Sequence, residues 1–352
     1  MSRSPTHRYT DPLDRIWLSA ADAIGLRVQR TPDTYASTPG DGMLLLAERP
    51  HLDADDSLAQ MILHELCHSL IEGREAFERR DWGLDNETER DVPRERACLR
   101  LQAALAGLFG LRRVLAPTTD YRAFYDTLPD DPFSPRLDPT TILAISGRRR
   151  ADGPPWAPHL MQALAATRAV AEAASGFVRP ASADAPDLFE LLDATPARHP
   201  TGLPGSPLAG AARTCGACAW RHGRAGLCRQ AGDAKVAASE PACERFEPAL
   251  DCQECGACCR AAYDCVEVSP RDPVRRKHPE LVVVRGPFLE VKRAGDRCAA
   301  LDGGQWEGPP DGDRRFVPFA CSIYADRPKS CRDFEAGGEH CLTARHRVGL
   351  TL

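Results

Sequence analysis

The sequence contains no long hydrophobic run. Its longest strongly apolar stretch without a charge, Leu101–Leu111, has eleven residues, whereas a helix needs about 20 to cross a bilayer. No apolar segment follows the basic residues near the N-terminus, so we expect no secretion signal. We expect a soluble, cytoplasmic protein, in which reduced cysteines more often bind metal than form disulfides.

An excess of positive charge is missing as well. The sequence has 45 Lys and Arg residues and 50 Asp and Glu residues, which gives a formal net charge of −5. Nucleic acids and anionic membranes are bound mainly through broad basic surfaces. The composition therefore argues against broad nucleic-acid binding and against a membrane partner.

Cysteine is nearly absent from the first 214 residues, which contain only Cys67 and Cys98. The other thirteen of the 15 cysteines lie between residues 215 and 341, and the intervening stretch 129–207 is rich in proline. We predict an α+β protein with four segments. These are a metal-binding domain at 1–128, a Pro-rich linker with one helix at 129–213, a four-cysteine segment at 214–248 and a cysteine-rich domain at 249–352.

The first hundred residues alternate between helical and strand patterns. Acidic residues suited to a helix start precede one long apolar pattern, and Gly73 follows its end. A second long pattern begins at a proline, which suits the first turn of a helix. The patterns predict helices at 20–24, at about 56–72 and at 93–109, and strands at 26–30 and 43–47.

The first of the two long helices carries the motif His64-Glu65-Leu66-Cys67-His68. Histidines four residues apart project from one helical face, where two imidazole nitrogens can bind one Zn²⁺ or Fe²⁺. Glu65 lies about 100° around the helix and can reach a metal-bound water without binding the metal. Apolar neighbours indicate a buried helix, in which histidines need partners. The motif therefore predicts His64 and His68 as metal ligands and Glu65 as a general base.

A third protein ligand is required, and several acidic residues follow the motif. Glu72 shares the face of both histidines, but one straight helix cannot wrap three ligands around a metal. Glu95 opens the second long helix, whose interior is otherwise apolar, so that a carboxylate there needs a cation. We predict Glu95 as the third ligand, with Glu89 as the alternative.

The motif followed by the helix that Glu95 opens resembles the zincin-like metallopeptidases of the gluzincin kind, in which a Glu on a second helix completes the site. It also resembles the elongation factor P hydroxylase family, in which a similar helix serves an iron-dependent hydroxylase. The resemblance covers about residues 40–110. It implies a zincin-like fold with a central HExxH helix, zinc or iron at that site, and a protein or peptide substrate.

Nine cysteines crowd the last hundred residues, four of them within the CxxCxxCC sequence that begins at Cys252. Tight CxxC turns let two thiolates bind one metal, and sulfur ligands select zinc or iron–sulfur clusters. The stretch 252–350 resembles the YkgJ-like cysteine-cluster family, described as zinc- or iron-chelating. The resemblance implies eight ligands and leaves Cys265 out: Cys252, Cys255, Cys258, Cys259, Cys298, Cys321, Cys331 and Cys341.

A separate set of cysteines precedes this cluster: Cys215, Cys218, Cys228 and Cys243. Their spacing is irregular for a named zinc ribbon, but four cysteines within twenty-nine residues suffice for one tetrahedral site. His222 could replace one of the thiols. We predict a metal site here too.

Three classes of function fit these motifs. The leading hypothesis is a metal-dependent enzyme, either a zinc hydrolase or a non-haem iron hydroxylase whose cysteine cluster relays electrons. The second is a non-enzymatic zinc- or iron-binding protein. The third is protein lysine methylation, because the cysteine cluster also occurs in flagellin lysine N-methylases. The sequence lacks a glycine-rich turn for S-adenosylmethionine, which counts against that class.

Overall fold

The structure is a computed structural model, and it describes residues 6–7, 9–85, 87–118, 121–177, 187–206, 213–308 and 315–352. The chain divides into two compact units, Met1–Ala197 (unit 1) and Arg198–Leu352 (unit 2). Both units combine helices with small sheets, which confirms the α+β class. Residues 178–186 and 207–212 of the predicted linker lie outside the described residues.

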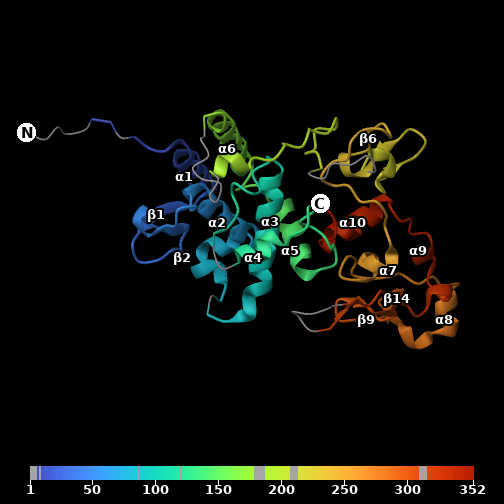
Figure 1. Ribbon diagram of the computed structural model, residues 1–352. Helices are drawn as coiled ribbons and strands as arrows, with labels where there is room; N and C mark the ends of the chain where they lie inside the picture. The colour runs from blue at the N-terminus through green and yellow to red at the C-terminus, as the bar shows by residue number, and fades with distance from the viewer. Residues whose placement is uncertain are drawn as a thin grey trace, which may run out of the picture. The chain divides into compact units, whose positions relative to one another are not determined.

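Unit 1 consists of helices and one three-stranded sheet, drawn from blue to green in Figure 1. Its longer elements are α1 Pro12–Ile24, β1 Arg27–Thr31, β2 Ala36–Gly40, β3 Met43–Ala47, α2 Leu58–Glu72, α3 Val92–Gly107, α4 Arg122–Asp126, α5 Pro139–Arg150 and α6 His159–Ser175. Short 3-10 helices are η1 Arg49–His51, η2 Arg74–Glu78, η3 Arg80–Gly83, η4 Glu89–Asp91 and η5 Leu188–Leu191.

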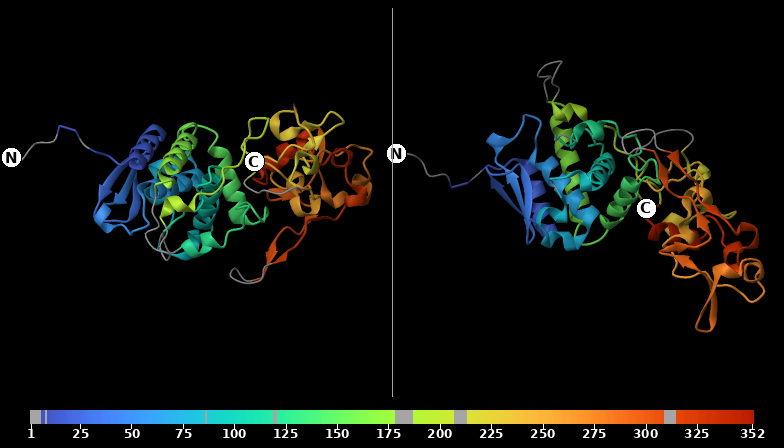
Figure 2. Two further views of the ribbon diagram at one scale, coloured as in Figure 1. Left: turned by 45° about the horizontal axis from the view of Figure 1, so that its top comes forward. Right: turned by 90° about the horizontal axis from the view of Figure 1, so that it is seen from below.

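The sheet of unit 1 has the strand order β1-β3-β2, and its strands lie beside α1 (Figure 2). β1 pairs parallel with β3, Arg27 opposite Met43, whereas β2 pairs antiparallel and forms an edge. The sequence patterns predicted β1 and β3. They missed β2, because its sequence Ala-Ser-Thr-Pro-Gly has no apolar alternation.

Helix α2 is the central element of unit 1. The Ser57 hydroxyl caps its start by accepting a hydrogen bond from the Gln60 amide, and Gly73, at φ 90°, ends it. Every residue from Leu58 to Ile71 except His64 is buried, because α1, α3 and α5 pack around the helix. The apolar pattern around the HExxH motif thus reflects packing on several sides.

Helices α5 and α6 belong to the core of unit 1, which differs from the linker predicted over 129–213. Ile145 and Leu160 are fully buried, and the Trp156 indole donates to Ser69 of α2 at 2.9 Å. Gly147 lets α5 approach closely, since a Cβ there would lie 2.7 Å from Leu101 of α3.

Unit 2 is built from short elements. They are η6 Cys215–Ala217, β4 Arg221–His222, β5 Leu227–Cys228, η7 Arg229–Ala231, β6 Ala234–Lys235, α7 Cys252–Cys255, η8 Ala257–Cys259, α8 Pro273–Lys277, η9 Pro279–Leu281, β7 Val282–Arg285, β8 Phe288–Val291, β9 Arg293–Ala294, β10 Arg297–Cys298, β11 Leu301–Asp302, β12 Trp306–Glu307, β13 Arg315–Phe316, β14 Ala320–Cys321, η10 Tyr324–Asp326, α9 Lys329–Arg332 and α10 Glu339–Arg347. Such short elements bury little apolar surface.

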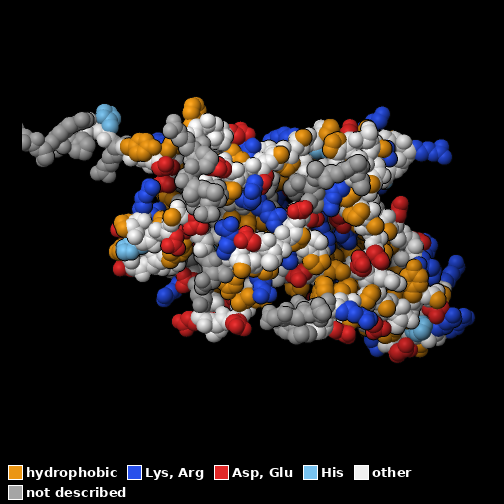
Figure 3. All heavy atoms as spheres, viewed as in Figure 1, with side chains coloured by type: hydrophobic (Ala, Val, Ile, Leu, Met, Phe, Trp, Pro, Cys, Tyr) orange, Lys and Arg blue, Asp and Glu red, His pale blue; other side chains and the backbone are white. Residues whose placement is uncertain are grey.

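The surface carries both signs of charge. Figure 3 shows acidic and basic side chains mixed over the visible face, with Lys and Arg side chains gathered around α8 and α9. Across the described ranges, no helix combines the length and the apolar character that a membrane span requires.

Candidate metal centres

Three of the predicted ligands come together between α2 and α3. His64 Nε2 lies 3.2 Å from His68 Nε2, and the Glu95 carboxylate lies 3.6 Å from His64 and 3.1 Å from His68. A metal held tetrahedrally at about 2.0–2.2 Å separates its ligand atoms by about 3.3–3.5 Å. The three atoms therefore already have nearly the spacing that one zinc or iron ion requires.

The hydrogen bonds of Gln102 orient His64 for this role. The Gln102 amide nitrogen donates to the Leu115 carbonyl at 2.8 Å, so its oxygen is the atom that faces His64 Nδ1 at 3.0 Å. An oxygen acceptor places the proton on Nδ1 and leaves the lone pair of Nε2 free for a metal. Gln102 is fully buried. No sequence pattern predicts a role for this residue.

His68 and Glu95 form an ion pair. Burial disfavours the charged imidazole, but the carboxylates of Glu95, Glu65 and Glu72 together outweigh burial and raise the pKa of His68 to about 9. Burial also disfavours the charged carboxylate, but both histidines outweigh it and lower the pKa of Glu95 to about 2. At neutral pH the His68 imidazole of this pair therefore carries a proton.

Metal binding at this centre should release one proton at pH 7.5, because the His68 imidazole must be neutral to bind metal and its pKa is about 9. The apparent zinc affinity should fall about tenfold per pH unit below that value. Calorimetry in two buffers of different ionisation enthalpy measures the protons released, with His68→Ala as the reference for all other sites. Equal proton release by both proteins would contradict the prediction.

Glu65 lies beside the three ligands and borders a cavity. The Trp82 indole donates to Glu65 Oε2 at 2.8 Å, and both side chains are buried. Trp82 and Asp81 have left-handed backbone angles, φ 58° and 47°, which non-glycine residues adopt at a cost of about 1–2 kcal/mol. The cavity has a volume of about 60 Å³ and is lined by Ala36, Ser37, Thr38, Glu65, His68, Asp81, Trp82 and Leu84.

Other acidic residues considered from the sequence lie elsewhere. Glu72 pairs with Arg94, and Glu89 lies in η4 and is exposed. Cys98 approaches the centre from α3, and its sulfur contacts the His64 carbonyl at 3.4 Å. One ligand atom from each of His64, His68 and Cys98 lies within 4.8 Å of the other two, so Cys98 is another candidate for the third ligand. Glu95 makes the closer contacts with the two metal-facing nitrogens, so we favour it as third ligand.

Replacing Glu95 by Ala should weaken metal binding at this centre by at least tenfold, because only two protein ligands would remain. Glu89→Ala removes an equally acidic side chain that touches neither histidine, and it should leave the affinity unchanged. Competition with a chromophoric chelator measures both affinities. The reverse order of effects would make Glu89 the third ligand.

Eight of the nine cysteines in the last hundred residues form two groups of sulfur atoms that share Cys258. Electrostatic interactions join Cys252 and Cys341 to Cys255 and Cys258, and a second set joins Cys298, Cys321 and Cys331 to Cys258. Cys259 interacts with Cys298 and Cys331, and its sulfur lies 3.8 Å from that of Cys258. All eight predicted ligands thus belong to this arrangement, whereas Cys265 is exposed and joins neither group.

Burial raises the pKa of the Cys298 and Cys321 thiols, and main-chain hydrogen bonds act in the opposite direction. The Ala300 and Ile323 amides donate to the sulfurs of Cys298 and Cys321, each two residues earlier in the chain. Such bonds favour the charged sulfur. Gly256, at φ 55°, lies under the Phe319 ring and makes the turn inside CxxCxxCC, where a Cβ would come within 2.8 Å of that ring.

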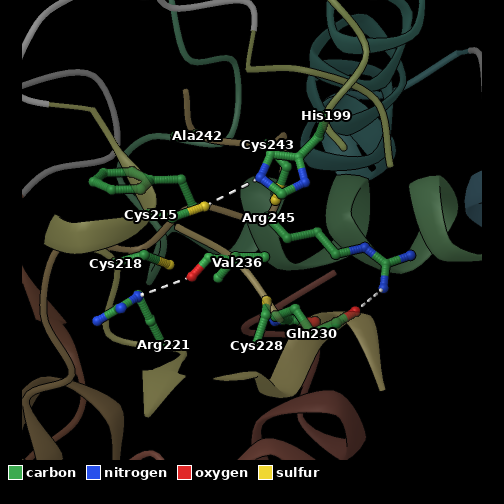
Figure 4. A pocket seen from close by; sticks show the side chains of 11 residues that line it. His199, Cys215, Cys218, Arg221, Cys228, Gln230, Val236, Ala242, Cys243 and Arg245 are labelled. Atoms are coloured by element: carbon green, nitrogen blue, oxygen red, sulfur yellow. Dashed lines mark hydrogen bonds between the residues drawn. The ribbon is translucent and has the colours of Figure 1, made fainter. Parts of the chain in front are cut away.

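Cys215, Cys218, Cys228 and Cys243 line one small pocket in unit 2 (Figure 4). His222, considered from the sequence as a substitute ligand, instead contacts Asp233 at 2.9 Å. His199 lies in the pocket in its place, and its Nε2 is 3.1 Å from the Cys215 sulfur. No spacing rule points to this histidine, because it precedes the first cysteine by sixteen residues.

Comparison with known proteins identifies one part of the chain. Residues 251–347 match the CxxCxxCC family, whose description is "Putative zinc- or iron-chelating domain". This part is similar to that family, and the matched residues are called the CxxCxxCC domain. The match confirms the resemblance of the last hundred residues and supports zinc or iron chelation by the CxxCxxCC domain. No curated protein and no solved structure matches the chain, so no relative supports the zincin-like resemblance of unit 1.

Proposed function

We propose that unit 1 is a zinc-dependent hydrolase that acts on a protein or peptide, joined in one chain to the metal-chelating CxxCxxCC domain. One observation carries the proposal. Two histidines and Glu95 present their ligand atoms to one point, and Glu65 lies beside them at a cavity. A purely structural metal site has no need of an additional buried carboxylate.

The chemistry follows from the positions of these side chains. Zinc at the three ligands would lower the pKa of a bound water and polarise a substrate carbonyl. Trp82 occupies Oε2 of Glu65, so Oε1 is the atom left to take a proton from water. The indole also fixes the carboxylate in place, and Glu65 can later deliver the same proton to the leaving amine.

A second candidate is a non-haem iron hydroxylase that modifies a protein. Two histidines and one carboxylate are also a typical iron ligand set, and the CxxCxxCC domain is described as zinc- or iron-chelating. In that case the cysteine cluster would relay electrons to unit 1. Metal analysis and an absorbance spectrum of anaerobically purified protein distinguish iron from zinc.

A non-enzymatic zinc- or iron-binding protein is the remaining candidate. Chelation by the CxxCxxCC domain is common to all three candidates, so it does not separate them. Catalytic turnover that depends on the metal centre of unit 1 would distinguish either enzyme from a non-enzymatic metal-binding protein.

Histidine replacements test the proposed function. His64→Ala or His68→Ala should release one metal equivalent per chain and abolish metal-dependent peptide hydrolysis, while cysteine-bound metal stays. Elemental analysis of the purified full chain and a casein-cleavage assay measure the two effects. His159→Ala, on α6 and outside the centre, is the control. Unchanged metal content in both variants would refute the site.

A further inference from the structure

Residues 198–248 precede the part that matches the CxxCxxCC family. Within this range, His199 and residues between Cys215 and Phe246 line a cavity of about 10 Å³, close to the space of a single water-sized sphere. The side chains of Cys215, Cys218, Cys228 and Cys243 line it (Figure 4). A cavity of this size excludes any organic ligand but accommodates one ion among four sulfur atoms.

Main-chain amides donate hydrogen bonds to two of these sulfurs. The Trp220 amide donates to Cys218, and the Arg245 amide donates to Cys243, each from two residues further along the chain. Cys298 and Cys321 of the CxxCxxCC domain have the same arrangement. The pocket therefore repeats the local geometry that the metal-chelating part of the chain uses.

Charged side chains of both signs lie around the pocket. Four thiolates and one divalent ion carry a net charge of −2. Arg221 and Arg245 both line the pocket and are held by hydrogen bonds to the carbonyls of Val236 and Gln230, at 3.4 Å and 3.1 Å. Arg221 favours a charged Cys215 sulfur, whereas Glu240 opposes that charge.

His199 faces the pocket with a protonated nitrogen. The Thr201 main-chain amide donates to His199 Nδ1 at 3.2 Å, so Nδ1 is the acceptor and the ring proton is on Nε2. Nε2 lies 3.1 Å from the Cys215 sulfur, and His199 is 5% exposed. A nitrogen that carries a proton cannot bind a metal, but it can donate to a thiolate.

We propose that residues 198–248 hold one Zn²⁺ through the thiolates of Cys215, Cys218, Cys228 and Cys243, and that His199 donates a hydrogen bond to Cys215. Four protein ligands close the coordination sphere, so the site is structural. His199 is a positioning residue that stabilises one thiolate. Glu240 lies within 4.8 Å of His199 and Cys215, but it does not line the cavity and is not a ligand.

Metal stoichiometry of the full chain tests the site. Cys218→Ser should lose one zinc equivalent by elemental analysis, whereas Cys265→Ser, at an exposed cysteine outside all groups, should lose none. A Cys218→Ser protein that keeps the zinc content of the wild type overturns the site.

Cadmium-113 NMR of the cadmium-loaded chain tests the role of His199, because the resonance of an all-sulfur site differs from that of a mixed sulfur–nitrogen site. Cys218→Ser should remove one all-sulfur resonance. His199→Ala should keep that resonance but bind zinc about 10–100-fold more weakly, and His199→Gln, which retains an N–H donor, should recover part of the loss. The assignment is overturned if the wild type shows a mixed sulfur–nitrogen resonance for this site and His199→Ala loses the ion. His199 would then be a ligand.

Thiol alkylation of the wild type gives an answer if Cys218→Ser does not fold. In the zinc-loaded protein the four cysteines should resist iodoacetamide while Cys265 reacts. A strong chelator should make all four reactive together. If they stay protected after zinc is removed, they are buried core thiols and the site is refuted.

Discussion

Glu65→Gln is expected to abolish hydrolysis while the metal stays bound. The substitution keeps the size of the side chain and an oxygen that can accept from Trp82, but an amide cannot take a proton from water. Loss of a general base costs about 10²–10⁴-fold in rate. Steady-state peptide hydrolysis with parallel metal analysis of the same preparation measures both quantities.

The matched control is Glu75→Gln, which removes an exposed carboxylate in η2 of the same unit. It should leave both turnover and metal content unchanged. A Glu65→Gln protein with wild-type turnover would exclude Glu65 as the base. Loss of the metal in that variant would instead make Glu65 a ligand.

Removing metal from unit 2 should abolish its cooperative unfolding. One apolar cluster of the CxxCxxCC domain is small, with Val268, Val274, Val291, Cys298, Ala300, Leu301, Phe319 and Ile323 as its buried members. A structural zinc contributes on the order of 10 kcal/mol to the folding of a small domain. We therefore expect metal bound by these thiolates to supply most of the stability of the short elements.

A fragment of residues 198–352 provides the measurement. With zinc and reductant it should melt in one transition by near-ultraviolet circular dichroism, and a strong chelator should remove that transition. A fragment of residues 1–197 should keep its transition, because α2, α3 and α5 form an apolar core without metal. A chelated 198–352 fragment that still melts cooperatively would show that its cysteines are core residues.

The sequence predicted the helices of the first centre well because their signals are local. The long apolar pattern, Gly73 and Pro93 locate α2 and α3 to within a few residues. Acidic residues were predicted to start α2, but Ser57 caps the helix instead. Asp56 accepts a hydrogen bond from the Tyr35 hydroxyl at 2.7 Å. Edge strand β2 escaped prediction because its pairing with β3 depends on contacts distant in sequence.

Side chains that orient the centres were harder to predict than the ligands. Gln102, Trp82 and His199 each act through one tertiary contact, with His64, Glu65 and Cys215 respectively. Ligands recur at spacings that a helix or a tight turn imposes, whereas an orienting residue can come from any nearby element. Only one signal could have drawn attention to Gln102. A buried amide is costly unless it is hydrogen-bonded, so an amide on an apolar helix needs a specific partner.

Gly147 of α5 has a consequence for the surroundings of the first centre. Its missing side chain lets α5 rest on Ile71 of α2 and Leu101 of α3, the two helices that carry the histidines and Glu95. A methyl group there would meet the tips of the Leu101 and Ile71 side chains, at 2.7 Å and 3.1 Å, so these flexible side chains would have to move before the helices do. A small residue that never touches the ligands thus fixes which rotamers the side chains beside the two ligand-bearing helices can adopt.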